Sequence, residues 1–345
     1  MAGGLGVRPS RLSLPTIRTM PNTTPRPAQP LLSAVVPFLN EADNLPRLIA
    51  ALEQVLTTLG MAWELVLVDD GSQDSSLTVA KAELQRRPQL QGIVISLSRN
   101  FGKEAALTAG LEAAQGDVVV PLDADLQDPP ELIGPMLEQW RQGFDVVYAV
   151  RRRRAGDSRT KRLTAFGFYR LMGRLSSTPI PADTGDFRLM DRCVVEALGQ
   201  LPERSRFMKG LFAWVGFRQT AIGYERDARA MGKSGWNYWK LWNFALDGIT
   251  SFSRVPLQVL SAGGLLVACL ALFYGVWMVL RTLLFGIDLP GYASLMTAVL
   301  FLGGVQLLGL GVLGEYLGRV FEEVKRRPLY LVRERWQQTT NRLET

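Results

Sequence analysis

Two aspartates, Asp123 and Asp125, lie one residue apart directly after an apolar run at 118–122, and Gln127 follows them. The run is typical of a buried strand, and in open α/β sheets ligands bind just outside the carboxyl ends of the strands. Carboxylate oxygens suit Mg²⁺ or Mn²⁺, and Mg²⁺ is commonly held by one or two carboxylates together with substrate phosphates. The spacing therefore favours a divalent metal that bridges the protein to a diphosphate. A solvated turn is the alternative interpretation of this short pattern.

Carboxylates also follow two other predicted strands, because Glu41, Asp69 and Asp70 each come after an apolar run. Strand and helix patterns alternate over residues 31–150, which predicts right-handed βαβ units and a mostly parallel sheet. The carboxylates would then meet at one edge of the sheet, where they repel one another unless a cation or hydrogen bonds compensate. Their convergence favours a nucleotide and metal site, although a helix N-cap explains any single one, as we expect for Asp74. The predicted strands cover 31–38, 64–68, 92–96 and 118–122, and the predicted helices cover 41–59 and 103–115.

Composition excludes several kinds of chemistry. The chain of 345 residues has no histidine, which rules out a histidine general base and a Ser-His-Asp triad. Cys193 and Cys269 lie in different regions, so neither a disulfide framework nor a cysteine-based zinc site is indicated. The net charge of +7 is concentrated beside the apolar segments and at 151–154. Anionic lipid headgroups or phosphorylated substrates explain that placement better than nucleic acid does.

Two stretches of 26 residues, 255–280 and 289–314, contain no charged side chain. Roughly 20 apolar residues are enough for a helix to cross a bilayer. We therefore expect transmembrane helices at 257–280 and 292–314, joined by a short loop. A buried pair of core helices is the alternative, but core helices of this length normally carry a polar face.

The distribution of basic residues predicts the orientation of these spans. Arg281 in the connecting loop is balanced by Asp288, whereas both flanks are basic. By the positive-inside rule, both termini and the large N-terminal part lie in the cytoplasm of a protein integral to the cell (inner) membrane. The flanking basic residues are Lys240, Arg254, Arg319, Lys325, Arg326, Arg327, Arg333 and Arg335.

The remaining segments are divided by composition. Residues 1–30 are rich in proline, threonine and arginine without an apolar core, so we expect a disordered tail and no signal peptide. Residues 31–230 form the predicted cytoplasmic domain. Residues 231–256 carry an aromatic stripe that favours an amphipathic helix at the membrane interface, with a packed core helix as the alternative. Residues 315–345 are expected to form a cytoplasmic tail.

Six short motifs, modest singly, carry a family resemblance in their order and spacing. They are Val36-Pro37-Phe38-Leu39-Asn40-Glu41, Val68-Asp69-Asp70-Gly71-Ser72, Ser98-Arg99-Asn100-Phe101-Gly102-Lys103, Asp123-Ala124-Asp125-Leu126-Gln127-Asp128-Pro129-Pro130, Arg206-Phe207-Met208-Lys209-Gly210 and Gly314-Glu315-Tyr316-Leu317-Gly318-Arg319. Over roughly residues 31–335 the chain resembles the GT-A glycosyltransferases of family 2. The branch it resembles contains the dolichyl-phosphate mannose synthases and the bactoprenol glucosyltransferases. The resemblance implies a Rossmann-like, mostly parallel α/β domain followed by an interfacial helix and two transmembrane helices.

The resemblance also implies roles for individual residues. It places Asp123, Asp125 and Arg206 in catalysis and Asp123, Asp125 and Gln127 on Mg²⁺ or Mn²⁺. The nucleotide would lie among Pro37, Asn40, Glu41, Asp70, Lys103 and Asp123. The phosphate of the lipid acceptor would face Arg151, Arg162, Arg229 and Lys233, and arginine suits phosphate because its planar fork binds two oxygens. This chain departs from the pattern at Gly232-Lys233-Ser234-Gly235-Trp236, where the lysine is displaced by two positions.

The absence of histidine fits a phosphate acceptor. A hydroxyl acceptor needs a general base, whereas a lipid monophosphate has a second pKa of about 6 and arrives at pH 7 mostly ionised. The protein then has only to align it and to stabilise the leaving diphosphate. Asp183 and Asp186 are candidates for binding sugar hydroxyls or acting as weak bases, with a strand cap as the alternative.

We therefore expect an inverting glycosyltransferase that moves a hexose, with UDP-glucose as the favoured donor, to a polyprenyl phosphate such as undecaprenyl phosphate. The expected partners are the nucleotide sugar, the lipid and the membrane, with a flippase and a second copy of the chain as further candidates. A processive polysaccharide synthase is one alternative, but such enzymes carry more spans and a Gln-x-x-Arg-Trp motif that this chain lacks. A nucleotide-sugar-binding membrane scaffold without activity is the other.

Overall fold

The computed structural model describes residues 26–151, 184–204, 206–224, 255–285 and 291–338. Several predictions from the sequence lie outside these residues. They are the tail up to residue 25, the roles of Arg162, Arg229 and Lys233, the role of Asp183, and nearly all of the amphipathic segment at 231–256. The side chain of Arg151 is also outside what the structure describes.

An eight-stranded mixed sheet forms the core of the α/β domain, in the order β7-β5-β6-β4-β1-β2-β3-β8. Its centre is parallel, because β1 pairs in parallel with both β2 and β4, and β2 pairs in parallel with β3. The predicted mostly parallel Rossmann-like sheet is confirmed, with antiparallel strands added outside the centre. The strands are β1 (Leu32–Phe38), β2 (Trp63–Asp69), β3 (Gln91–Leu97), β4 (Val118–Pro121), β5 (Val146–Arg151), β6 (Thr184–Asp191), β7 (Gln219–Tyr224) and β8 (Val332–Gln337).

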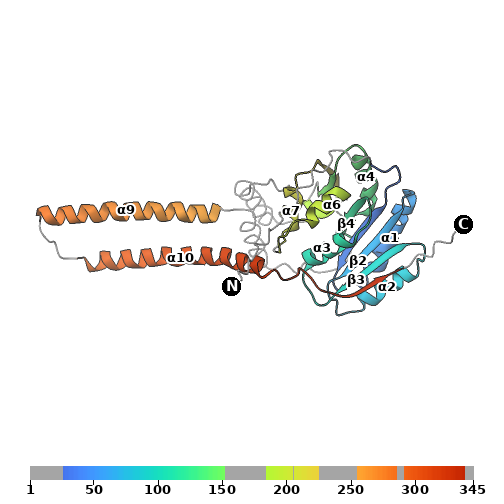
Figure 1. Ribbon diagram of the computed structural model, residues 1–345, viewed down its shortest axis with the longest axis horizontal. Coiled ribbons are helices and arrows are strands. Elements are labelled where there is room, and N and C mark those ends of the chain that lie inside the picture. The colour runs from blue at the N-terminus through green and yellow to red at the C-terminus, as the bar shows by residue number, and fades with distance from the viewer. Residues whose placement is uncertain (1–25, 152–183, 205, 225–254, 286–290, 339–345) are drawn as a thin grey trace, which may run out of the picture.

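Helices cover both faces of this sheet (Figure 1). Alternate residues of β1 point to opposite faces, so Val36 joins the hydrophobic cluster that includes α1 and α4, whereas Val35 joins the cluster that includes α3, α6 and α7. Burial on both faces explains why the central strands are continuous apolar runs. The helices are α1 (Leu45–Thr58), α2 (Ser76–Gln85), α3 (Lys103–Ala113), η1 (Pro130–Leu132), α4 (Ile133–Arg141), α6 (Arg192–Gly199) and α7 (Met208–Trp214).

The start of the described chain packs on the domain, although a disordered tail was predicted for residues 1–30. Arg26 donates hydrogen bonds to the Phe144 carbonyl oxygen and to Asp145 Oδ1, both at 3.0 Å. Its guanidinium also lies 4.8 Å from the centre of the Trp140 ring. Residues 26–30 therefore belong to the domain, because Arg26 finds an aromatic ring and a carboxylate that are distant in sequence.

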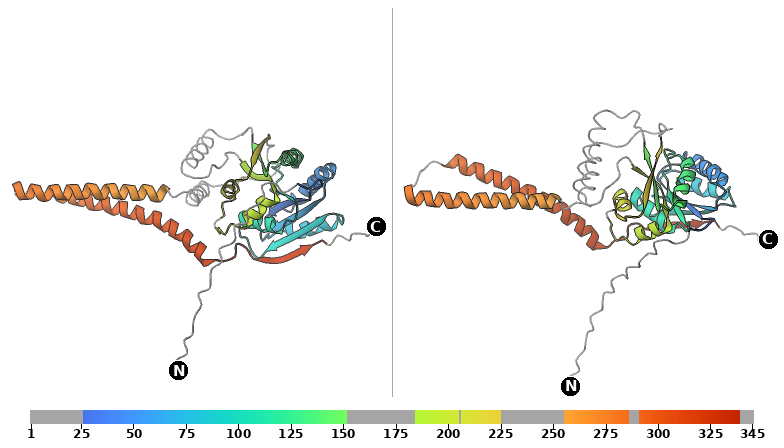
Figure 2. Two further views of the ribbon diagram at one scale, coloured as in Figure 1. Left: turned by 45° about the horizontal axis from the view of Figure 1, so that its top comes forward. Right: turned by 90° about the horizontal axis from the view of Figure 1, so that it is seen from above.

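Two long apolar helices, α9 (Val255–Phe285) and α10 (Tyr292–Lys325), lead away from the α/β domain (Figures 1 and 2). Leu257–Phe285 and Phe301–Lys325 are long and apolar enough to cross a membrane, with mean hydropathies of 2.2 and 1.3. No part of either apolar window is buried inside the protein. The alternative of a buried core pair is therefore wrong for the described helices.

The segment after the second apolar stretch is not a tail. The helix α10 continues through Lys325, and β8 then pairs antiparallel with β3 at the edge of the sheet. Ser98 N donates to the Leu331 carbonyl oxygen at 2.8 Å, and Lys81 Nζ lies 2.6 Å from Glu334 Oε1. This strand was not predicted from the sequence because its pairing partner lies more than 200 residues earlier, and no local pattern identifies such a partner.

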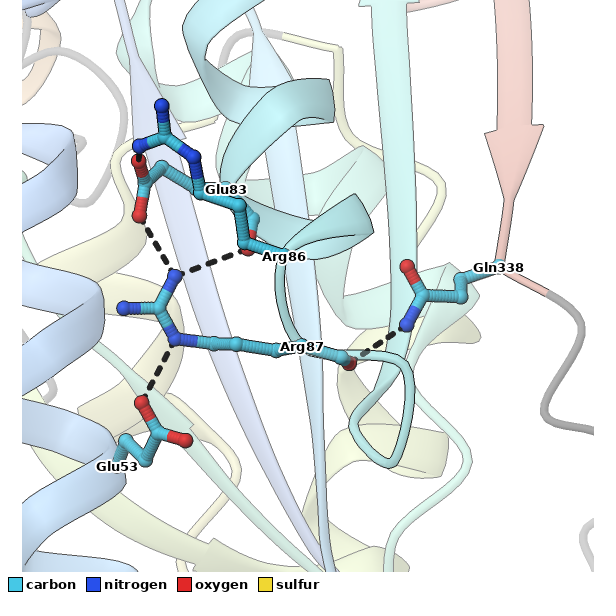
Figure 3. Close-up of polar contacts among 5 residues, drawn as sticks. All are labelled: Glu53, Glu83, Arg86, Arg87 and Gln338. Carbon is cyan, nitrogen blue, oxygen red and sulfur yellow. Dashed lines mark hydrogen bonds and ion pairs between the residues drawn. The ribbon is translucent and has the colours of Figure 1, made fainter.

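Arg87, which follows α2, connects three parts of the domain (Figure 3). Its Nε donates to Glu53 Oε2 of α1 at 2.7 Å, and its Nη1 donates to Glu83 Oε2 at 2.6 Å. Its carbonyl oxygen accepts a hydrogen bond from the side-chain amide of Gln338 at 2.7 Å. The chain that follows the apolar helix α10 is therefore held at β3 and at the end of α2.

Candidate functional site

The loops that follow β1 and β2 lie against each other at the carboxyl edge of the sheet. Asn40 N donates to Ser72 Oγ at 3.0 Å, and Gln73 N donates to Asn40 Oδ1 at 2.9 Å. Asn40 has a φ of 56°, a left-handed conformation that asparagine tolerates better than most residues. Glu41 N donates to Ser76 Oγ at 2.8 Å. The expected convergence of the first two strand ends is therefore present in the structure.

Both carboxylates at the end of β2 organise neighbouring loops. Asp69 Oδ1 accepts from Ser72 N at 2.9 Å, and Asp69 Oδ2 accepts from the Ser96 hydroxyl at 2.9 Å. Asp70 accepts from Phe101 N at 2.8 Å and from Gly102 N at 3.0 Å. Burial raises the pKa of Asp70, with a smaller contribution in the same direction from Asp69, although the two backbone hydrogen bonds favour its charged form. Asp70 was expected at the nucleotide, and here it holds the loop that leads into α3.

The turn after β2 requires a glycine at position 71. Gly71 has a φ of +75°, and a Cβ at this position would lie 2.6 Å from the carbonyl carbon of Arg99. Backbone atoms cannot move aside as the end of a flexible side chain can, so any larger residue would separate this turn from the 98–102 loop. Gly71 therefore allows the close approach that brings Asp70 to the start of α3.

An ammonium group connects the ends of β4 and β6. Lys103 Nζ, at the first residue of α3, lies 2.6 Å from Asp123 Oδ1 and 2.6 Å from Asp186 Oδ2. Burial alone would lower the pKa of Lys103, but Asp186 and Asp123 raise it well above its ordinary value. Burial alone would raise the pKa of Asp186, but Lys103 above all, and then Lys209 and Arg188, hold it below its ordinary value. Lys103 and Asp186 therefore stabilise each other's charged forms.

The loop after β4 carries the residues expected to bind metal. Gln127 N donates to Asp125 Oδ1 at 3.1 Å, and Leu126 between them has a φ of 59°. Asp123 and Asp125 remain partly exposed, whereas Gln127 is 7% exposed. No group of three or more His, Cys, Asp or Glu side chains suited to a metal occurs in the described part of the chain. Asp123, which already attracts the Lys103 ammonium, and Asp125 fit a metal that takes its other ligands from a diphosphate and water.

Two ionisable residues beside this cluster, the buried Arg188 and the partly buried Glu104, were not identified from the sequence. The Arg188 guanidinium donates to the carbonyl oxygens of Gly185 at 2.8 Å and Asp186 at 3.3 Å, and it stacks 3.7 Å from the centre of the Phe212 ring. Burial lowers the pKa of Arg188 to about 10. Burial and then Asp186 raise the pKa of Glu104 to about 8. Arg188 lies in an ordinary alternating strand, so no sequence signal marked it.

The remaining predicted residues within the described part of the chain are Pro37, Arg206 and, as backbone only, Arg151. Pro37 is buried within β1 opposite Val68. Arg206 donates to the carbonyl oxygens of Leu201 at 2.8 Å and Glu203 at 3.2 Å, in the chain that follows α6. Its recorded contacts are with that chain and with α3, so its role at a phosphate stays a prediction. The backbone of Arg151 ends β5 next to the end of β7.

Residues 33–199 match the family model for glycosyl transferase family 2, and residues 255–320 match the model of the GtrB C-terminal hairpin. An uncharacterised glycosyltransferase of Synechocystis is 56% identical over 305 residues, which cover 88% of this chain and 95% of that protein. The prophage-derived bactoprenol glucosyl transferase of Shigella flexneri is 46% identical over 303 residues, which cover 88% of this chain and 97% of that protein. The prophage bactoprenol glucosyl transferase homolog of Escherichia coli K12 is 45% identical over 302 residues, which cover 88% of this chain and 98% of that protein.

Solved structures with a related α/β domain are more distant. Mannosyl-3-phosphoglycerate synthase from Rubrobacter xylanophilus is 23% identical, with a TM-score of 0.46, and the match covers 68% of this chain and 75% of that one. Glucosyl-3-phosphoglycerate synthase from Mycobacterium tuberculosis, solved with Mn²⁺, UDP-glucose and phosphoglyceric acid, is 22% identical, with a TM-score of 0.42. That match covers 64% of this chain and 78% of the mycobacterial chain.

Proposed function

Because the chain belongs to glycosyl transferase family 2, among the relatives of the bactoprenol glucosyl transferases, we propose that it transfers glucose from UDP-glucose to undecaprenyl phosphate. The expected GT-A fold is confirmed, and the chain is a glycosyltransferase that acts in polyprenyl-linked transfer. The donor, the length of the lipid and the side of the membrane are parts of the proposal. The proposed reaction takes place at the cytoplasmic face.

The observation that carries this proposal is the meeting of Asp123, Lys103 and Asp186 beside Asp125, at the carboxyl end of β4. This edge is where open α/β sheets bind their ligands. The cluster combines a cation that suits phosphate oxygens with carboxylates that suit a divalent metal or sugar hydroxyls. A site of this composition fits a nucleoside diphosphate sugar.

Asp123 and Asp125 are the residues that would hold Mg²⁺ or Mn²⁺, and Gln127 stays a predicted third ligand. When bound there, a divalent cation supplies positive charge to a leaving diphosphate. The residues of the chain do the remaining work. Lys103 adds a fixed positive charge at the diphosphate, and Asp186 faces it across the cluster, where a sugar hydroxyl can donate to it.

The acceptor needs no protein base. An oxygen of the ionised lipid phosphate attacks the anomeric carbon, while the bond from that carbon to the β-phosphate oxygen of UDP breaks and its electron pair leaves with UDP. A single displacement inverts the anomeric configuration. The chain contributes alignment and charge stabilisation, which are sufficient when the nucleophile is already charged.

The two exposed apolar helices support a membrane anchor next to this site. Basic residues at the end of α10 and in β8 support the cytoplasmic orientation, because the positive-inside rule places such residues in the cytoplasm. They are Arg319, Lys325, Arg326, Arg327, Arg333 and Arg335. This orientation would place the α/β domain where nucleotide sugars are made available.

A donor panel in detergent tests the proposal. Purified protein receives undecaprenyl phosphate with UDP-glucose, UDP-galactose, UDP-N-acetylglucosamine, GDP-mannose or UDP-aminoarabinose derivatives, each radiolabelled in the sugar. We expect an organic-soluble, mild-acid-labile product from UDP-glucose, and its loss with chelator or in Asp125→Ala. Full activity without divalent metal would overturn the metal-dependent mechanism.

The same panel separates the alternatives. An insoluble polymer would indicate a processive synthase. Binding of a UDP-sugar without turnover would indicate a scaffold. A lipid-linked product from another sugar would keep the reaction class and correct only the donor.

A further inference from the structure

Lys103 occupies the position between two carboxylates that come from different strands. Its Nζ lies 2.6 Å from Asp123 Oδ1, after β4, and 2.6 Å from Asp186 Oδ2, in β6. The side chain of Lys103 is 44% exposed and that of Asp123 is 35% exposed, whereas that of Asp186 is 13% exposed. The ammonium therefore lies at the mouth of the cluster, with Asp186 behind it and Asp123 on the side of the predicted metal.

Asp123 Oδ1 cannot serve the ammonium and a divalent cation equally well. Two positive charges on one carboxylate oxygen lie within a few ångströms of each other and repel. Binding of metal at Asp123 must therefore weaken or break the contact from Lys103. In the structure the Lys103 ammonium lies at the carboxylate where the metal is predicted to bind.

The ammonium displaced from Asp123 would have two partners, one in the protein and one in the donor. Asp186 keeps one contact with it, and Asp186 Oδ1 is buried without a hydrogen-bond partner among the described residues, so that carboxylate has unused acceptor capacity. The second partner is the diphosphate of a donor, since phosphate oxygens are strong acceptors for an ammonium. Without a nucleotide, an ammonium released from Asp123 has only the Asp186 carboxylate as a negatively charged partner. With a nucleotide, the diphosphate oxygens replace the lost Asp123 contact.

We propose that Lys103 is a resident counter-cation that competes with the divalent metal for Asp123 and moves to the donor diphosphate, so that metal and nucleotide bind with positive coupling through this side chain. This inference rests on the proposed function, because it assumes a metal and a diphosphate at the cluster. It adds an order of events: the metal binds weakly to the free protein and firmly once the nucleotide is present. By linkage, the metal strengthens nucleotide binding by the same factor.

The test measures Mn²⁺ binding to the full-length protein in detergent by the loss of the free Mn²⁺ spin-resonance signal, with and without saturating UDP. Free UDP binds Mn²⁺ itself, so each measurement is corrected for that complex, and variants are compared at the same UDP concentration. In Lys103→Met we expect Mn²⁺ to bind the nucleotide-free protein roughly fivefold more tightly than it binds wild type. In the presence of UDP this advantage should disappear, so the coupling between the two ligands shrinks by the same factor.

Lys81→Met is the matched control. Lys81 also forms an ion pair at 2.6 Å, with Glu334, but between α2 and β8. Its Mn²⁺ affinities with and without UDP should equal those of wild type. Lys103→Arg, which keeps the charge, should retain weak binding of Mn²⁺ alone and serves as a second variant if Lys103→Met does not fold.

Three results would overturn the inference. The first is unchanged or weaker Mn²⁺ binding to nucleotide-free Lys103→Met. The second is an equal gain with and without UDP, which indicates a general effect of removing a positive charge. The third is tight Mn²⁺ binding to Lys103→Arg alone. A wild-type protein that binds UDP-glucose and Mn²⁺ while the variants fail these expectations leaves the proposed function standing, whereas a wild type that binds neither ligand overturns both.

Discussion

The carboxylate of Asp70 accepts a hydrogen bond from the backbone N–H of Gly102 at 3.0 Å, and a second from Phe101 at 2.8 Å. Asp70 directly follows β2, which ends at Asp69, whereas Gly102 immediately precedes α3 and its Lys103. One buried side chain therefore sets the position of the helix start that delivers the ammonium to Asp123. Through this contact, the end of β2 fixes where the Lys103 ammonium lies in the site.

Replacing Asp70 should impair the site and the stability together. Asp70→Ala leaves two backbone N–H groups without their acceptor, and hydrogen bonds to charged groups contribute about 1.5–3 kcal/mol each. We expect Tm to fall and the UDP affinity to drop by tenfold or more, since the start of α3 is released. Calorimetric titration with UDP and thermal unfolding in detergent measure both effects. Asp70→Asn keeps one acceptor oxygen and should lie between wild type and alanine; an alanine variant with wild-type Tm and affinity would contradict this role.

Glu104 should make the stability depend on pH. Burial, followed by repulsion from Asp186, raises its pKa from 4.5 to about 8, so the folded protein binds a proton there that the unfolded chain releases. Stability therefore falls as pH rises from about 5 to about 8, because the folded state binds more protons than the unfolded state across this window. Glu104→Gln should abolish the uptake of about one proton on folding, so that stability depends less on pH in this range. It should also raise Tm at pH 8 relative to wild type.

The comparison for Glu104 is Glu138→Gln, on the exposed face of α4. Its Tm should follow that of wild type from pH 5 to pH 9. Thermal unfolding in buffers matched for ionic strength gives both profiles. Parallel profiles for wild type and Glu104→Gln would show that Glu104 does not take up this proton.

Adjacent arginines after α2 should differ strongly in their contribution to stability. The side chain of Arg87 is 15% exposed and pairs with Glu83, which is 6% exposed, whereas that of Arg86 is 73% exposed. Arg87→Met removes the less exposed of the two guanidinium groups that pair with the buried Glu83 carboxylate, and also the ion pair with Glu53. It should lower the free energy of unfolding by about 3 kcal/mol. Arg86→Met should change it by less than about 1 kcal/mol. Chemical denaturation followed by tryptophan fluorescence measures both, and equal effects would argue against the buried network in Figure 3.

The strand β8 should protect the β3 edge of the sheet from association with other molecules. Truncation after Leu331 removes β8 and Gln338 and exposes the N–H and C=O groups of β3 that now pair with it. Unpaired edge strands promote association, so we expect aggregation during size-exclusion chromatography in detergent. Truncation after Gln338 keeps the strand and should elute as the full chain does. A monodisperse, active chain ending at Leu331 would show that β8 is dispensable.

Local patterns in the sequence were sufficient for much of this protein. The apolar runs that become β1 to β4 have the length and flanking turns of buried strands, and the uncharged stretches around 257–280 and 292–314 match the helices α9 and α10. The positions of Asp123 and Asp125 at a strand end follow from the same local reasoning. Parallel βαβ connections then predict that neighbouring strand ends meet, as the contacts between Asn40 and the turn after β2 show.

Only the tertiary structure decided which charged groups are partners. Lys103 meets Asp186 from 83 positions away, Asp70 accepts from backbone groups 31 and 32 positions later, and β8 returns to pair with β3. Each pairing depends on how strands are ordered and on which side chains burial brings together. A sequence pattern reports the period of a helix or strand, but an ion pair between distant segments has no period. The carboxylates at 123 and 125 were therefore visible in the sequence, and the lysine that neutralises one of them was assigned by the fold.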